Sequence, residues 1–173
     1  MKRILAVLIA VMLLVAVMPA TSLAAGIASN GDLKVFHAAT NGGTLHLRAE
    51  ASTKAGIVSS LPNGTALIRV SSKTVKEDGY VWVQVKTTNG MKGWVAKKWI
   101  KDNAHADVNT QRDGLNVRSK RSASSKKTIL YSIPHGTRDV NIYKVNGNWA
   151  YVNYKGDSRK GWSSLGYLRW ALW

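Results

Sequence analysis

Residues 82–95 read WVQVKTTNGMKGWV, and this stretch decides the fold. Val83 and Val85 alternate with more polar neighbours, the pattern of a strand with one buried face. Asn89-Gly90 then supplies the strongest short signal for a tight hairpin turn, because both residues adopt positive φ easily. Gly93-Trp94-Val95 begins a second apolar run. The stretch therefore predicts two antiparallel strands joined by a short turn.

The same pattern returns in the second half of the chain. Trp149-Ala150-Tyr151-Val152 matches Trp82-Val83-Gln84-Val85 at an offset of 149 − 82 = 67, and Gly161-Trp162-Ser163 matches Gly93-Trp94-Val95 at 161 − 93 = 68. Three further pairs match in the same order: Leu45-His46-Leu47-Arg48 with Leu115-Asn116-Val117-Arg118, Pro62-Asn63-Gly64-Thr65 with Pro134-His135-Gly136-Thr137, and Trp99-Ile100 with Tyr167-Leu168. Five blocks in one order indicate an internal duplication.

Each copy reads as a small all-β domain. The predicted boundaries are 31–101 and 104–173, joined by the short linker 102–103. Strands are expected at 65–72 and 137–144, because both stretches are rich in β-branched residues and follow a Pro-x-Gly turn. So many short strands in a small domain bury their edges best by closing into a barrel. The prediction is two tandem β-barrels.

The N-terminus has the features of an export signal. Lys2 and Arg3 precede an uncharged apolar run over 4–17, and Ser22-Leu23-Ala24 ends in the small residues that a signal peptidase recognises. We expect residues 1–24 to be removed, leaving 25–30 as an N-terminal extension and no integral membrane segment. The alternative is a retained anchor, although a single spanning helix needs about 20 apolar residues. Export without any cysteine fits a bacterial surface protein better than a disulfide-rich secreted domain.

In both copies the order of blocks resembles the bacterial SH3-like (SH3b) family: Leu-x-Val-Arg, a Ser-rich loop, Pro-x-Gly-Thr, Trp-x-x-Val, Gly-Trp-Val and an aromatic-aliphatic end. The resemblance implies two tandem SH3-like β-barrels of five to seven strands and a role in holding exported proteins on peptidoglycan. The chain departs from the family in two places. The loop after Arg48 and after Arg118 lacks the Gly-Pro that is common there, and Ser163 replaces the Val of Gly-Trp-Val. These departures concern the shape of the ligand site rather than the barrel.

Catalysis is poorly supported by the composition. The absence of cysteine excludes a thiol nucleophile and thiolate-bound metals. His37, His46, His105 and His135 show none of the spacings of a zinc site. Composition alone leaves a Ser-His-Asp arrangement open, yet the two copies leave no third segment for a deep catalytic cleft. We therefore expect a non-enzymatic protein with no catalytic residue, no metal and no cofactor.

Aromatic residues are the better candidates for ligand binding. The chain has 7 Trp and 6 Tyr but only 1 Phe. If the valines of residues 82–85 enter the barrel, then Trp82 and Trp149 point outward or lie under a loop. Beside Tyr80 and Tyr151 they would form flat apolar platforms with a hydrogen-bond donor, suited to sugar rings or an extended peptide. Alternatively, these indoles close a barrel end or bury the contact between the copies.

Positive charge is the second candidate feature. The formal net charge is +16, from 25 basic and 9 acidic residues. Lys120, Arg121, Lys126 and Lys127 crowd one loop of the second copy with no acid among them. Such a loop attracts phosphate and carboxylate groups, although a generally solvated basic surface is equally consistent with the counts. Nucleic acid would feel the same field, but export makes it an improbable partner.

Together these features predict a secreted, non-catalytic protein that binds a polymer of the bacterial cell wall, either peptidoglycan or an anionic teichoic acid. The predicted binding residues are Tyr80, Trp82, Trp149, Tyr151, Lys120, Arg121, Lys126 and Lys127. The alternative is an exported adaptor that binds an extended peptide of another surface protein. Co-sedimentation with cell wall distinguishes the two functions, because an adaptor binds one partner protein and does not sediment with the wall.

Overall fold

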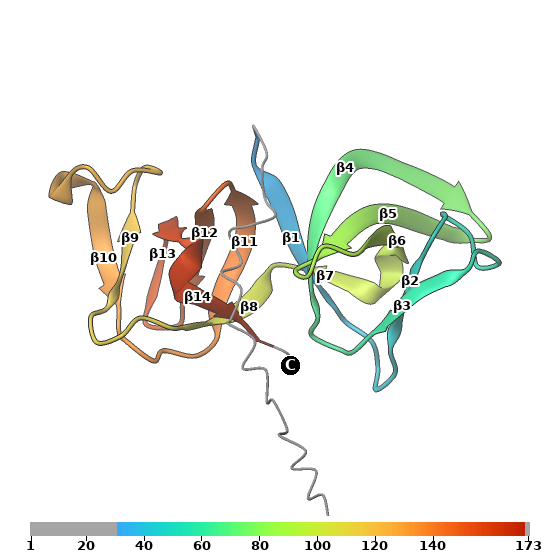
Figure 1. Ribbon diagram of the computed structural model, residues 1–173, viewed down its shortest axis with the longest axis horizontal. Helices are drawn as coiled ribbons and strands as arrows, with labels where there is room; N and C mark the ends of the chain where they lie inside the picture. Colours follow the sequence, from blue (N-terminus) through green and yellow to red (C-terminus); the bar gives the residue numbers. More distant parts are fainter. Residues whose placement is uncertain (1–30, 172–173) are drawn as a thin grey trace, which may run out of the picture.

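A computed structural model describes residues 31–171 as an all-β protein (Figure 1). The strands are β1 Leu33–Ala38, β2 Leu45–Arg48, β3 Ile57–Leu61, β4 Ala66–Glu77, β5 Tyr80–Thr87, β6 Lys92–Ala96, β7 Ile100–Asp102, β8 Ala104–Val108, β9 Leu115–Arg118, β10 Ile129–Ile133, β11 Val140–Asn146, β12 Trp149–Tyr154, β13 Asp157–Ser164 and β14 Leu168–Trp170. Short 3₁₀ turns occur at η2 Lys97–Trp99, η3 Lys126–Thr128 and η4 Leu165–Tyr167. The predicted signal peptide (1–24) and extension (25–30) lie outside the described residues. None of the helices within 31–171 has the length and apolar character needed to span a bilayer.

The hairpin expected at residues 82–95 is present. Val83 pairs with Val95 and Val85 with Gly93 in β5 and β6. Gly90 closes the turn with a φ of 92°. At Gly93 an added Cβ would lie 2.6 Å from the Arg48 carbonyl oxygen, so only glycine lets β6 approach β2 this closely. The equivalent Gly161 has the same close approach, 2.7 Å, to the Arg118 carbonyl oxygen.

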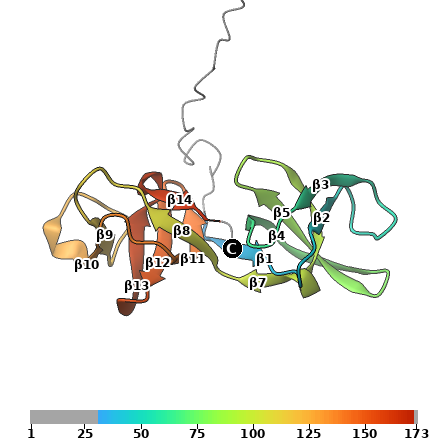
Figure 2. The same ribbon diagram turned by 90° about the horizontal axis from the view of Figure 1, so that it is seen from below.

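Eleven of the described strands form one antiparallel, hydrogen-bonded path in the order β10-β9-β13-β12-β11-β1-β4-β5-β6-β2-β3, and β7, β8 and β14 pair with it from the side, β7 with β1, β8 with β11 and β14 with β8. Strand β1 lies at the middle of this path. Its start pairs with β11 at Leu33 and Lys34, and the rest pairs with β4 and β7. Figures 1 and 2 both show β1 between two groups of strands. The all-β prediction is confirmed, but the sheet is continuous and open, so two separate closed barrels stay a prediction.

The buried side chains form two hydrophobic cores. The first contains Phe36, Leu47, Leu67 and residues of β5 and β6. The second contains apolar residues of β8 to β12, η4 and β14, and it also takes in Val35, Ala66 and Ile68 from the first half of the sequence. Adjacent residues on β1 and β4 therefore point into different cores, because side chains alternate along a strand. The second core is completed by side chains from the first half of the sequence.

The junction between the halves is very short. β7 ends at Asp102 and β8 begins at Ala104, so Asn103 alone separates the two strands. Asn103 has a positive φ of 64°, and its side chain donates to Asn141 Oδ1 at 2.7 Å. Its carbonyl oxygen lies 2.8 Å from His37 Nδ1. The linker is therefore hydrogen-bonded to both halves.

Candidate ligand-binding grooves

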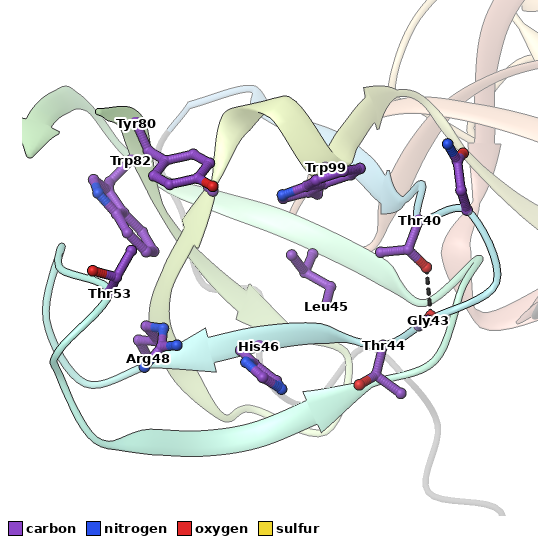
Figure 3. A pocket seen from close by; sticks show the side chains of 12 residues that line it. Thr40, Gly43, Thr44, Leu45, His46, Arg48, Thr53, Tyr80, Trp82 and Trp99 are labelled. Carbon is purple, nitrogen blue, oxygen red and sulfur yellow. Dashed lines mark hydrogen bonds between the residues drawn. The ribbon is translucent and has the colours of Figure 1, made fainter. Parts of the chain in front are cut away.

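The first half contains a groove of about 400 Å³ (Figure 3). One side is the loop over residues 40–44, and β2 runs along the base with Leu45, His46 and Arg48. Tyr80, Trp82 and Trp99 contribute the aromatic surface. Figure 3 shows Trp99 above Leu45, with Tyr80 and Trp82 gathered near Arg48 and Thr53. The groove thus combines an apolar wall with a cationic end.

Trp82 is part of this wall but is not a free platform. Its side chain is only 3% exposed, and Nε1 donates to the Glu77 carbonyl oxygen at 3.0 Å. Of the alternatives for Trp82, the outward-facing platform is wrong, because β4 extends to Glu77, beyond the predicted 65–72, and pairs along the start of β5. The Tyr80 ring packs edge-on against the indole, at a centroid distance of 6.0 Å. Tyr80 and Trp99 are the half-buried aromatic residues of this groove.

Arg48 gives the groove its charge. Its guanidinium Nη1 donates to the Ala55 carbonyl oxygen at 2.6 Å, which fixes the side chain at the end of β2. No acidic side chain is present among the described residues that line this groove. A ligand that enters it therefore meets a positive group and aromatic rings, a combination that favours a carboxylate or a neutral polar group next to an apolar surface.

Asp78 holds the loop that forms one end of the groove. Its carboxylate accepts hydrogen bonds from Ser52 Oγ at 2.7 Å, Thr53 N at 2.8 Å and Thr53 Oγ1 at 2.9 Å. The Ser52 hydroxyl, followed by the Thr53 donors, lowers the pKa of Asp78 below its usual value. Because Asp78 sits in the β4–β5 turn, these bonds tie that turn to Thr53 in the groove wall.

A second groove, of about 840 Å³, occupies the equivalent place in the second half. Leu115, Arg118, Trp149 and Tyr167 line it at the positions that match Leu45, Arg48, Trp82 and Trp99 in the repeat alignment. Arg118 is anchored like Arg48, since its Nη1 donates to the Ser125 carbonyl oxygen at 2.9 Å. The second groove is more polar, because Arg112 and Asp113 stand in its loop where the first half has Gly42 and Gly43. Tyr167 is 53% exposed.

The remaining predicted residues do not line either groove. Tyr151 packs against Trp162 at a centroid distance of 5.1 Å, on the face opposite Ala150 and Val152. Lys120, Lys126 and Lys127 are exposed, as expected, but Arg121 forms an ion pair with Asp32 at 2.7 Å. The basic loop is therefore partly neutralised by an acid 89 residues away in sequence.

Sequence reasoning missed Arg48, Arg118, Trp99 and Tyr167 as groove residues. A signal for them was available, because all four stand in blocks that match between the copies. Asp78 and Asp32 carried no such signal, since their partners are distant in sequence. Within residues 31–171 the His and acidic side chains form no group of three that could hold a metal ion.

In a comparison with known protein families, residues 43–101 match the model of the family described as the bacterial SH3 domain. No curated protein matches the sequence. Among solved structures, NlpC2 and NlpC1 of Trichomonas vaginalis each align at 17% identity with a TM-score of 0.41. The alignments cover 80% and 84% of this chain but 48% and 49% of those proteins, so the chain spans about half their length.

Proposed function

We propose that this chain is a secreted, non-catalytic protein that binds the bacterial cell wall through two SH3-like modules. The match of residues 43–101 to the bacterial SH3 domain indicates a cell-wall-associated or extracellular protein. The observation that carries the finer proposal is the pair of grooves, which lie at equivalent places and share an anchored arginine and aromatic residues.

The chemistry of the grooves suits peptidoglycan. Its sugar rings and peptide side chains offer apolar faces to Trp99 and Tyr167, and its peptide carboxylates are acceptors for Arg48 and Arg118. The benefit of two grooves is greatest if each alone binds in the millimolar range. Two grooves in one chain raise the overall affinity by about 100-fold or more when both reach their sites at once.

Co-sedimentation with purified peptidoglycan stripped of teichoic acid tests this function. We expect the chain to sediment, and Trp99→Ala and Tyr167→Ala each to reduce the bound fraction, with a larger loss for the double variant. Tyr143→Ala, which removes an aromatic ring outside both grooves, is the matched control and should bind normally. Failure of the wild-type chain to sediment at low salt rules the proposal out. Binding that disappears above about 0.3 M salt would assign it to charge rather than to aromatic contact.

A peptide-binding adaptor is the second candidate, and strand β3 supports it. β3 lies at an end of the strand order and pairs only with β2 among the described strands. Ile57 and Val58 on this strand are 51% and 46% exposed. An edge strand with exposed apolar residues can accept an extended peptide as a further strand. Val58→Lys should then abolish capture of a partner protein by cross-linking while leaving wall sedimentation unchanged.

We also propose that the chain has no catalytic role of its own. The 173 residues contain no cysteine, and the matching blocks extend across both halves. Zymography on cell walls tests this directly. A cleared zone produced by the purified chain would contradict it.

A further inference from the structure

Three side chains of the second half converge on one carboxylate from the first. Asp32, immediately before β1, accepts hydrogen bonds at Oδ1 from Arg121 Nη1 at 2.7 Å and from Asn146 Nδ2 at 3.0 Å. Its Oδ2 accepts from Lys144 Nζ at 2.6 Å. The donors come from the loop after β9 and from β11. Two positive charges and one amide therefore surround a single negative group.

The two cations are also positioned by aromatic rings. Ala150 and Val152 face the core, so Tyr151 and its cross-strand partner Trp162 lie on the opposite face of the sheet. Arg121 lies over the Trp162 ring at 4.9 Å from its centroid, and Lys144 lies 5.2 Å from the same ring and 4.8 Å from that of Tyr151. Cation–π contacts of this kind add to the Asp32 ion pairs in holding the charges at the sheet surface.

This arrangement is specific to the second half. At the positions that match Arg121 and Tyr151 in the repeat alignment, the first half has Ala51 and Gln84. The Trp that both cations contact, in contrast, is present in both halves, as Trp94 and Trp162. The fold of one copy therefore does not require the cationic cluster, and a separate role accounts for it better than packing does.

We propose that Arg121, Lys144 and Asn146 form a binding site for an oxyanion, the carboxylate or phosphate group of an anionic polymer, and that Asp32 occupies this site as an internal competitor. The proposal goes beyond the grooves, which do not contain these residues. Charge-assisted bonds of this type are the strong hydrogen bonds of protein surfaces, and the Asp32 contacts show that the geometry accepts two oxygens of one group. The Lys144 and Asn146 hydrogen bonds also lower the pKa of Asp32, so the competitor is charged at neutral pH.

The internal competitor makes the site selective for multivalent ligands. A tethered carboxylate has an effective concentration in the millimolar range or above, so a single free anion displaces it poorly. A polymer with many anionic groups rebinds each time Asp32 leaves. Removal of the Asp32 charge should therefore strengthen polymer binding, the opposite of what a purely structural ion pair predicts.

Calorimetric titration of the full chain with poly-L-glutamate at low salt tests the site, with sodium polyphosphate as the parallel arm that separates carboxylate from phosphate preference. We expect the Asp32→Asn variant to bind poly-L-glutamate about 5- to 10-fold more tightly than the control variant Glu50→Gln. A gain of this size follows if the Asp32 carboxylate occupies the site for most of the time, since the apparent affinity scales with the fraction of free sites. The control removes one acidic charge from an exposed position in the matching loop of the first half, so both variants have the same net charge. Adding Arg121→Gln to Asp32→Asn should cancel the gain.

Two results would overturn the proposal: equal affinities for Asp32→Asn and Glu50→Gln, or a gain that persists after Arg121→Gln. Circular dichroism checks that each variant is folded. If Asp32→Asn does not fold, the side-chain amide resonance of Asn146 in the wild-type chain provides the readout, and it must shift when poly-L-glutamate is added. Trp99→Ala alters the first groove and its core but none of the Asp32 contacts, so it should leave the gain intact; failure of the groove hypothesis and failure of this one are therefore distinguishable.

Discussion

Replacing Ile68 by Ala should destabilise the second half of the molecule, although Ile68 lies in the first half of the sequence. Ile68 lies on β4, is 1% exposed, and packs with Val140, Ile142 and the other residues of the second core. Truncation of a buried Ile to Ala costs about 2–5 kcal/mol, from lost apolar transfer and from the cavity that remains. We expect a loss of this size in the free energy that protects the amides of β11 and β12 from hydrogen exchange.

Leu67 provides the matched comparison, because it is the adjacent residue, is equally buried and points into the first core. Leu67→Ala should lower the protection of β5 and β6 first. Amide exchange resolved by strand reads out both variants, since local opening energies differ across a structure. If Ile68→Ala leaves the exchange of β11 and β12 unchanged, then the shared core does not stabilise the second half and the reasoning is refuted.

Three further outcomes follow from single contacts. The fold lowers the pKa of Asp78, so the ionised carboxylate stabilises the Thr53 loop at pH values above the unfolded pKa of about 3.9. This stabilisation is lost as the pH falls through the lower pKa of the folded state. The Thr53 amide resonance should therefore be constant from neutral pH to about pH 5 and move at more acidic pH. Gly93→Ala should destabilise the fold, since its Cβ would lie 2.6 Å from the Arg48 carbonyl oxygen, whereas Gly43→Ala meets open space and should be neutral in thermal melts. Burial raises the pKa of Tyr131 to about 12, so a spectroscopic tyrosine titration should contain a late step that Tyr131→Phe removes.

The sequence was sufficient to predict the hairpin over residues 82–95 but not the bounds of the strands predicted at 65–72 and 137–144, which the structure has at Ala66–Glu77 and Val140–Asn146. Alternation at Val83 and Val85 and the Asn89-Gly90 turn depend on neighbouring residues, and the hairpin formed as expected. Contacts between distant segments were not predictable in this way. The burial of Trp82 depends on how far β4 extends, and the pairing of β1 with β11 joins residues more than 100 positions apart, as in Lys34 with Lys144.

The candidate site was predicted in part for the same reason. Repeated residues drew attention to Trp82 and Trp149, and both line a groove. The exposure of these indoles could not be predicted from the alternation of side chains along a strand, because alternation identifies the face of the strand but not what covers that face. The neutralisation of Arg121 by Asp32 depends on the position of β1, which no local pattern specifies.

The shared strand has a consequence for two-site binding. β1 hydrogen-bonds to both β4 and β11, and Asn103 is bonded to both halves, so the two grooves are held by one sheet rather than joined by a free linker. Avidity through a fixed spacing depends sharply on whether the ligand presents its binding units at that spacing. Peptidoglycan fragments of increasing length should therefore show a step in affinity at one length, and Tyr167→Ala should remove the step while leaving binding of the shortest fragments to the first groove. If affinity instead rises smoothly with fragment length in both the wild-type chain and the Tyr167→Ala variant, then the two grooves act independently.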